Sequence, residues 1–498
     1  MKRNIDRDRL YNVLFCLLVF AAMSVFFIAL HPIPIMDEDD VIYTVWSRKA
    51  IPIPGAFNPA QVMPELLSSL CGNLAGLCTA LRLGSFIDCQ VTVTGLVFSL
   101  FITAYVFSLK RLLEKRFRSG SFVSVCLAML FLLLHFLIFR SADAGNLYLF
   151  HTYDEACVFF YTIPSLLCCS LIMFFMTEPE KEPQLTGKRP LRESMLLFLL
   201  YFAVFSKLYG SAILAVYAFC RALRGFRKAR AEGKNFLKTE AVWIAVLLFW
   251  ILAAILESTG GRAGGAETSG LVAALGQTAA ELRKLLGKTA LLFRLLVPAA
   301  ALAALAALAA EKNGENRKRA LSVFGGILAW SVLNGLFLLL LSAVVNPTYA
   351  SRPEAMFTML FPLLLLMILG FACAIRRWPR IALLLPIALL FVYSMTNTRF
   401  LTFADSNPLE LNGHLAVRVE NEIYDSIIRA AENGETEMWV RVPVSGEDGN
   451  WPHNGNIGKS MAHFFLKYGI IDHEIYVHTQ PSEEFNREFL IPLPGETP

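Results

Sequence analysis

The sequence predicts an all-α polytopic membrane protein with a small α/β domain in its C-terminal part. Of the 498 residues, 56% are hydrophobic and 17% are charged, and the mean hydropathy is +0.53. A typical soluble domain carries about 25% charged residues. The apolar residues also gather in runs of about 20, the length that crosses a bilayer. These observations exclude a soluble enzyme, a disordered chain and a disulfide-stabilised secreted protein.

Charge is divided unequally along the chain. Residues 397–498 hold 7 Lys/Arg and 16 Asp/Glu, a net charge of −9, whereas residues 1–396 carry a net charge of +14. The basic residues lie in short loops between apolar runs, which is typical of cytoplasmic loops. We therefore predict a transmembrane domain over 1–396, which includes the long external loop 31–90, and a small extracytoplasmic α/β domain over 397–498. The basic charge does not require nucleic-acid binding.

Ten apolar runs are candidate membrane spans. The first follows MKRNIDRDR and has no small-x-small cleavage site, so we interpret it as an uncleaved span with a cytoplasmic N-terminus. The runs are 11–30, 91–109, 122–139, 156–176, 194–220, 241–256, 289–310, 321–345, 355–374 and 381–395.

The fifth run is predicted to form a hairpin rather than one span. Loops 177–193 and 221–240 carry four and seven Lys/Arg, so both are expected in the cytoplasm. Lys207 and Gly210 interrupt the run, and half-helices of about 10–12 residues rise only about 15–18 Å each, against a bilayer core of about 30 Å. A re-entrant hairpin gives about eleven helices and an external C-terminal domain. One ordinary span with an anomalous basic loop is the alternative.

The external loop 31–90 is long and contains mixed apolar and polar stretches, which predict short helices on the outer membrane surface. Its three cysteines, Cys71, Cys78 and Cys89, are compatible with one disulfide or with three free thiols. No Cys/His spacing resembles a zinc site. A later stretch, LVAALGQTAAELRKLLGK, is amphipathic and is predicted to lie in the membrane interface.

The strongest chemical signal is a run of four acids, Asp37, Glu38, Asp39 and Asp40, shortly after the first span. A carboxylate can accept the proton of an acceptor hydroxyl. A neighbouring acid can orient that base or hold a divalent metal such as Mg²⁺ or Mn²⁺. We predict Asp39 or Asp40 as the base, then Asp37, with Glu38 in the same site. The alternative is a helix N-terminus, where the helix dipole favours acids.

Further polar residues lie at the predicted outer face. Asp154 and Glu155 stand at the mouth of the fourth span, where a merely solvated pair is the alternative. Three basic residues stand apart: Lys207 at the hairpin tip, Arg352 in an external loop, and Arg399 at the end of the last span. An unpaired charge in the bilayer, as at Lys207, costs about 2.5–3.5 kcal/mol. Basic side chains at the outer membrane level can bind a phosphate group. The three bases therefore indicate a lipid phosphate, with interfacial snorkelling as the alternative for Arg399.

The C-terminal residues alternate between helix and strand patterns. Helices are predicted over 415–434 and 460–469, and strands over 437–444 and 473–478. The polar loop between them contains Trp451 and Asn454, a composition that suits sugar binding and equally suits a capped turn.

Together these features resemble the GT-C superfamily of integral-membrane glycosyltransferases, and more narrowly a bacterial family of multi-pass membrane proteins close to it. The matching stretches are Asp39-Asp40 with Tyr43, Tyr161 with Pro164, Pro347 with Arg352, and Trp451/Asn454 followed by Tyr468-Gly469. There are two departures from the family pattern. Asp154-Glu155 replaces a small or glycine-containing stretch, and four acids replace a simple pair.

The resemblance implies an inverting glycosyltransferase of the plasma (inner) membrane. It would move a sugar from a polyprenyl-phosphate donor to a cell-envelope glycan or lipid on the outer face, with an acid of the first loop as base. The implied substrate-binding residues are Asp154, Glu155, Tyr161, Lys207, Arg352, Arg399, Trp451 and Asn454. A transporter, flippase or polymerase for a lipid-linked surface polysaccharide is the alternative. A transporter favours internal repeats and midplane polar sites, and neither is evident in the sequence.

Overall fold

A computed structural model describes residues 2–36, 38–139, 148–150, 155–182, 190–233, 235–261, 270–395, 412–444 and 455–493. Within these ranges, six helical segments are long and apolar enough to cross a membrane. They are Arg9–Leu30, Phe86–Lys115, Glu155–Thr177, Leu291–Ala309, Gly314–Val345 and Phe357–Arg377. The chain is therefore a helical membrane protein, as its composition predicts.

Each of the ten apolar runs is mainly helical. In the first half, the elements are α1 (Lys2–Val25), η1 (Phe26–Leu30), α2 (Glu38–Val45), α3 (Val62–Ala80), α4 (Phe86–Lys115), α5 (Ser121–His135), α6 (Glu155–Cys157), η2 (Val158–Thr162), α7 (Ile163–Thr177), η3 (Pro179–Lys181), α8 (Pro190–Val204) and α9 (Leu208–Glu232). The second half continues with α10 (Phe236–Thr239), α11 (Ala241–Glu257), α12 (Leu271–Gly287), α13 (Leu291–Ala309), α14 (Gly314–Val345), η5 (Pro347–Ser351), α15 (Phe357–Arg377), η6 (Pro379–Leu384) and α16 (Leu385–Met395).

The span built from α6, η2 and α7 is the centre of the helix bundle. Of its most apolar window, 89% is buried, against 28% for the spans of α1 and α13. It packs against α4 on one side and α9 on another. A lipid-facing helix can keep apolar side chains exposed, but a central helix is surrounded by protein. Side chains at the start of this span are therefore held by neighbours from several segments.

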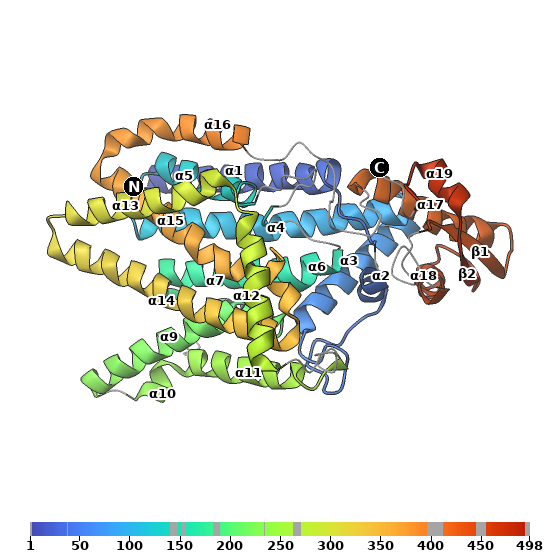
Figure 1. Ribbon diagram of the computed structural model, residues 1–498, viewed down its shortest axis with the longest axis horizontal. Coiled ribbons are helices and arrows are strands. Elements are labelled where there is room, and N and C mark those ends of the chain that lie inside the picture. Colours follow the sequence, from blue (N-terminus) through green and yellow to red (C-terminus); the bar gives the residue numbers. More distant parts are fainter. Residues whose placement is uncertain are drawn as a thin grey trace.

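The bundle has two distinct ends, because its long helices run roughly along the long axis of the molecule (Figure 1). The basic end comprises residues 110–120, 178–182, 221–233, 311–320 and 376–380. The acidic end comprises, of the described residues, 31–36, 38–85, 346–356, 412–444 and 455–493. Helix α12 crosses the long helices instead of following them, which agrees with its predicted interfacial position.

The fifth apolar run divides into two helices at the position predicted for the hairpin turn. Helix α8 ends at Val204 and α9 begins at Leu208, so the chain breaks at Lys207. The residues that flank the segment form an ion pair, with 3.0 Å between Arg221 Nη2 and Glu182 Oε2. The chain between them must therefore leave the basic end and return to it.

Impermeant-thiol labelling tests this arrangement. We expect Lys181→Cys and Arg227→Cys to be protected from a reagent added outside, because both positions lie at the basic end. Thr348→Cys, exposed at the acidic end, serves as the labelled control. The background carries serine in place of reactive native cysteines. Labelling of only one of the two basic-end positions would contradict the hairpin.

Loop 31–90 forms α2, α3 and the first residues of α4. The prediction of short helices in this loop is therefore correct. All ten cysteines are free thiols. Of the two alternatives for Cys71, Cys78 and Cys89, the structure therefore has three free thiols and no disulfide.

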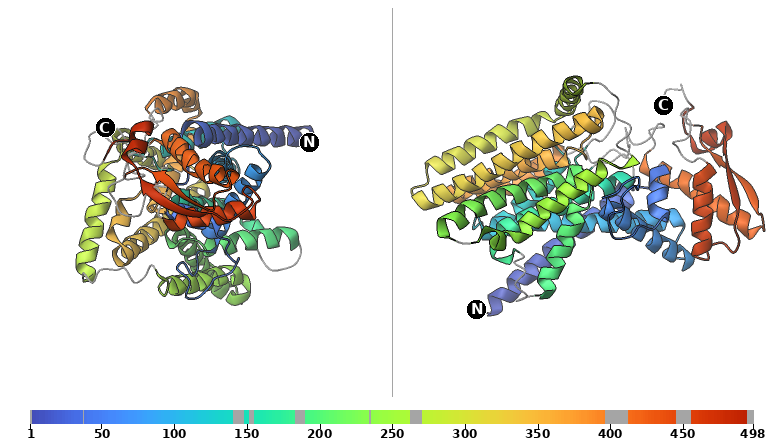
Figure 2. Two further views of the ribbon diagram at one scale, coloured as in Figure 1. Left: turned by 90° about the vertical axis from the view of Figure 1, so that its right-hand side faces the viewer. Right: turned by 90° about the horizontal axis from the view of Figure 1, so that it is seen from below.

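The C-terminal segment follows the predicted order of helices and strands. It contains α17 (Gly413–Glu432), β1 (Glu437–Val442), α18 (Gly455–Lys467), β2 (Tyr476–Pro481) and a further helix, α19 (Glu483–Phe489). The strands pair in parallel, from Glu437 with Tyr476 to Val442 with Pro481, and α18 makes the crossover. Figure 2 shows this segment at one end of the molecule.

The hydrophobic core of the C-terminal segment extends into the first hundred residues. Ile35, Val41 and Phe86 belong to one buried cluster with α17 and α18 side chains such as Ile423 and Phe464. The Phe86 ring lies 5.4 Å from that of Phe464, in an edge-on contact. The C-terminal segment is therefore packed on α2 and the start of α4.

Candidate functional site

Asp40 of the first loop is held by two main-chain hydrogen bonds. It is buried, and its two oxygens accept main-chain N–H groups, Oδ2 from Met36 at 2.7 Å and Oδ1 from Ala156 at 2.6 Å. Hydrogen bonds to a carboxylate are among the stronger ones in proteins. Helix α2 begins at Glu38, so Glu38, Asp39 and Asp40 also occupy its first turn. This is the helix N-terminus that the sequence offered as the alternative to a catalytic site. Asp40 thus joins α2 to the start of the central span.

Glu155, at the start of the central span, is buried beside α4. Its Oε1 accepts hydrogen bonds from Gln90 Nε2 at 2.5 Å and from Thr94 Oγ1 at 3.2 Å. The carboxylate is therefore fixed inside the protein, which excludes the alternative of a merely solvated charge for this residue.

The C-terminal segment contributes a third buried acid. Glu420 of α17 is fully buried, and Tyr424 one turn later is nearly so. Burial raises the pKa of the Tyr424 phenol well above its usual value, and so do the nearby charges of Glu420, Asp40 and Glu155. Sequence reasoning missed Glu420. Its position on the apolar face of an amphipathic helix was the available signal.

The other first-loop acids have a different environment. Glu38 and Asp39 are half-buried. Glu38 lines a cavity of about 290 Å³ between α2 and α18, together with Trp46 and Ser460. A ligand in this cavity can reach Glu38, whereas Asp40 is enclosed.

Two cations converge on one aromatic ring of the central span. Lys207 Nζ lies 5.3 Å from the centre of the Tyr161 ring, and the Arg352 guanidinium lies 5.5 Å from it. Both distances are within cation–π range. Lys207 immediately precedes α9 at the hairpin break, and Arg352 follows η5. The structure thus brings together three predicted site residues from three separate segments.

Arg352 is held as a permanent cation. Its Nε donates to Oε1 of the fully buried Glu354 at 2.5 Å, and its Nη2 donates to Cys157 Sγ at 3.1 Å. Burial acts against the charge, but Glu354, with Cys157 and Tyr161, raises the pKa of Arg352 well above its usual value. Glu354 balances part of this charge, and Lys207 adds a second cation beside the same aromatic ring.

The contacts of Asp40 and of the two cations lie little more than one helical turn apart along the central span. Ala156 contacts Asp40, and Tyr161, five residues later, contacts both cations. At about 1.5 Å per residue, this spacing corresponds to about 7–8 Å along the axis. Residues 158–162 form the π-helical turn η2, a feature often found at functional sites.

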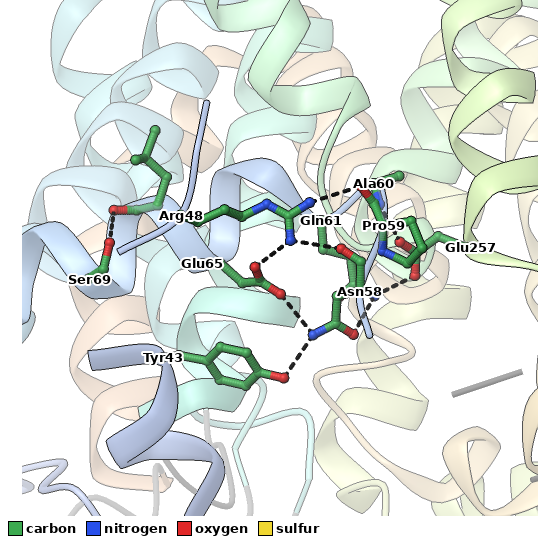
Figure 3. Close-up of polar contacts among 10 residues, drawn as sticks. Tyr43, Arg48, Asn58, Pro59, Ala60, Gln61, Glu65, Ser69 and Glu257 are labelled. Atoms are coloured by element: carbon green, nitrogen blue, oxygen red, sulfur yellow. Dashed lines mark hydrogen bonds and ion pairs between the residues drawn. The ribbon is translucent and has the colours of Figure 1, made fainter. Parts of the chain in front are cut away.

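A polar network holds the first loop against this region (Figure 3). Arg48 forms an ion pair with Glu65, and it donates to the main-chain oxygen of Asn58 at 2.8 Å. Asn58 Nδ2 in turn donates to Tyr43 OH at 2.7 Å and to Glu65 Oε1 at 2.8 Å. The Tyr43 ring lies 4.6 Å from that of Phe160, next to Tyr161.

The same network reaches the end of α11. Glu257 accepts from Gln61 Nε2 at 2.5 Å and from the Ala60 main-chain N–H at 2.8 Å (Figure 3). Sequence reasoning missed this network. The presence of opposite charges, Arg48 and Glu65, in the same loop was the available signal.

Five predicted site residues lie outside the described residues: Asp37, Asp154, Arg399, Trp451 and Asn454. Over the ranges that are described, no group of three or more His, Cys, Asp or Glu side chains is arranged to hold a metal ion.

The fold and the site define a helical membrane protein with buried acids and a cation pair at one end of its bundle. Comparison of the chain with protein-family models, curated proteins and solved structures finds no match. The geometry of the site is therefore the basis for a functional proposal.

Proposed function

We propose that the protein is a GT-C-type membrane glycosyltransferase. It transfers a sugar from a polyprenyl-phosphate donor to a cell-envelope glycan or lipid at the acidic end, on the outer face of the membrane. The observation that supports this most is the convergence of three segments on residues 155–162. Lys207 and Arg352 contact Tyr161, and Asp40 binds the start of α2, which carries the accessible acid Glu38, to Ala156. A donor of this class needs cations for its phosphate and an acid for the acceptor hydroxyl, next to apolar helices for its chain.

In the proposed reaction, the acceptor oxygen attacks the anomeric carbon and transfers its proton to a first-loop carboxylate. The bond between the anomeric carbon and the phosphate oxygen breaks, and the phosphate keeps the electron pair. Lys207 and Arg352 stabilise the charge that develops on that phosphate. Asp39, Glu38 or Asp37 serves as base. Asp40 and Glu155 position the loop and the central span.

A radiolabelled polyprenyl-phosphate sugar in proteoliposomes distinguishes the transferase from a carrier. Transfer releases polyprenyl phosphate and moves the label to the acceptor. A flippase would move the intact donor across the bilayer without breaking the sugar–phosphate bond. Intact translocated donor with no transfer, in the presence of envelope acceptors, would replace the transferase proposal by the carrier.

Removal of either cation is expected to raise the apparent KM for the donor. A hydrogen bond to a charged group contributes about 1.5–3 kcal/mol, so Arg352→Ala or Lys207→Ala should cost roughly 10–100-fold. Arg352→Lys should recover part of the loss, because Lys lacks the planar fork that binds two phosphate oxygens. Lys284→Ala removes an exposed charge from α12 and is the matched control. Equal KM values for Arg352→Ala and this control would contradict the phosphate site.

A further inference from the structure

A cavity of about 400 Å³ lies at the basic end of the bundle. The elements that line it and those of the proposed transfer site are at opposite ends of the long axis of the molecule (Figure 1). The interior of the cavity includes Tyr217 and the buried side chains of Ile327 and Trp330. Five arginines and one glutamate also line it: Arg116, Arg118, Arg221, Arg224, Arg376 and Glu182. Cationic groups therefore surround a partly aromatic recess.

The charges of this cavity are only partly balanced. Three arginines have protein partners: Arg221 pairs with Glu182 at 3.0 Å, Arg376 pairs with Glu311 at 3.2 Å, and Arg116 donates to the Met176 main-chain oxygen at 2.7 Å. Arg118 and Arg224 form neither a hydrogen bond nor an ion pair within the part of the chain that the structure describes. Two guanidinium groups thus remain for a ligand.

Gly326 of α14 lies beside one of these two arginines. A Cβ atom at Gly326 would lie 2.5 Å from Arg224 Nη2, so a larger residue there would displace the end of this flexible side chain. Positive charge on loops suffices to orient a membrane protein. It does not require that arginines line a partly aromatic cavity between helices.

We propose that this cavity binds a phosphate group, and that a membrane phospholipid headgroup is its main source. Arginine binds phosphate through two parallel hydrogen bonds. Basic pockets between membrane helices are known to accept headgroups that carry several phosphates. The aromatic and aliphatic interior suits the first carbons of such a lipid. This inference is independent of the proposed transferase activity, because the site lies at the opposite end and uses other residues.

Binding to the purified full-length protein in phosphatidylcholine nanodiscs tests the inference. The probes are cardiolipin, added to the nanodisc, and inorganic diphosphate, added to the buffer. The test variant is Arg118→Gln with Arg224→Gln, and we expect roughly 10-fold weaker binding or more for each arginine removed. The control is Arg227→Gln with Arg230→Gln, which removes two exposed charges from α9 that do not line the cavity. The control should bind as the unaltered protein does.

A third variant separates the cavity from general surface charge. Gly326→Leu keeps every arginine but displaces the flexible end of Arg224, so it should also weaken binding. Cardiolipin binding that depends on these residues supports the lipid source, and diphosphate binding with the same dependence supports a free phosphate compound. Equal weakening in the control pair, unaltered affinity in Gly326→Leu, or no binding of either probe would overturn the proposal.

Discussion

Replacing Asp39 by asparagine is expected to slow sugar transfer by about 10²–10⁴-fold, the range for the loss of a general base. Asparagine keeps the shape and polarity of the side chain but cannot accept the acceptor's proton. Glu38→Gln is the matched variant, because both acids are half-buried in the first turn of α2. The larger loss identifies the base. The measurement is kcat with saturating donor, accompanied by the thermal unfolding midpoint.

Asp40→Asn separates catalysis from structure. Both oxygens of Asp40 accept main-chain N–H groups, so an amide nitrogen would place a donor against a donor. An unsatisfied buried group of this kind costs about 1–3 kcal/mol. Asp40→Asn should therefore lower the unfolding midpoint as well as activity, whereas Asp39→Asn should affect activity far more. Full activity in the amide variants of all four acids, Asp37 included, would exclude the first loop as the source of the base.

Replacing Arg48 by methionine is expected to destabilise the protein by about 3–5 kcal/mol, as is usual when one partner of a buried ion pair is removed. The side chains of Arg48 and Glu65 are only 7% and 13% exposed, so Glu65 would keep a charge without its cation. A large loss of activity should follow, because Arg48 and Asn58 hold the loop that carries Tyr43.

An exposed pair provides the control for this prediction. Arg429 and Glu422 also form an ion pair, but their side chains are 53% and 35% exposed. Arg429→Met should cost less than about 1 kcal/mol. The comparison uses chemical denaturation of the purified protein in one detergent. Equal destabilisation by Arg48→Met and Arg429→Met would mean that the first-loop network is not what stabilises this region.

Local sequence pattern was enough to locate most of the helices and both strands, because apolar periodicity and turn residues act over short distances. The hairpin break illustrates this, since Lys207 and Gly210 marked it in the sequence. The structure adds the reason for the glycine. A Cβ atom at Gly210 would lie 2.9 Å from the Pro164 side chain, so α9 packs against α7 only without one. The α19 helix, by contrast, was not predicted.

The sequence predicted several residues of the candidate site but not the contacts between them. Single charges in apolar surroundings indicated Lys207 and Arg352, because such charges are costly unless they have partners. Their common contact, Tyr161, depends on how three distant segments pack. The same limit applies to Glu420, because Tyr424 lies near the charges of both Glu420 and the first-loop acid Asp40, which are far apart in the sequence. The type of each residue can be read directly from the sequence, whereas contacts between distant segments depend on how the whole chain packs.

The shared core of α2, α4, α17 and α18 has a consequence for how the protein is made. Ile35, Val41 and Phe86 are synthesised early, but the residues that cover them begin beyond position 412, about 300 residues later. At about 5–20 residues per second, the ribosome needs roughly 15 s to one minute for that interval. Throughout this interval the first loop presents an uncovered apolar surface. A nascent chain that stalls in the middle of the bundle should therefore be a target for quality-control proteases, even when its early spans are correctly inserted.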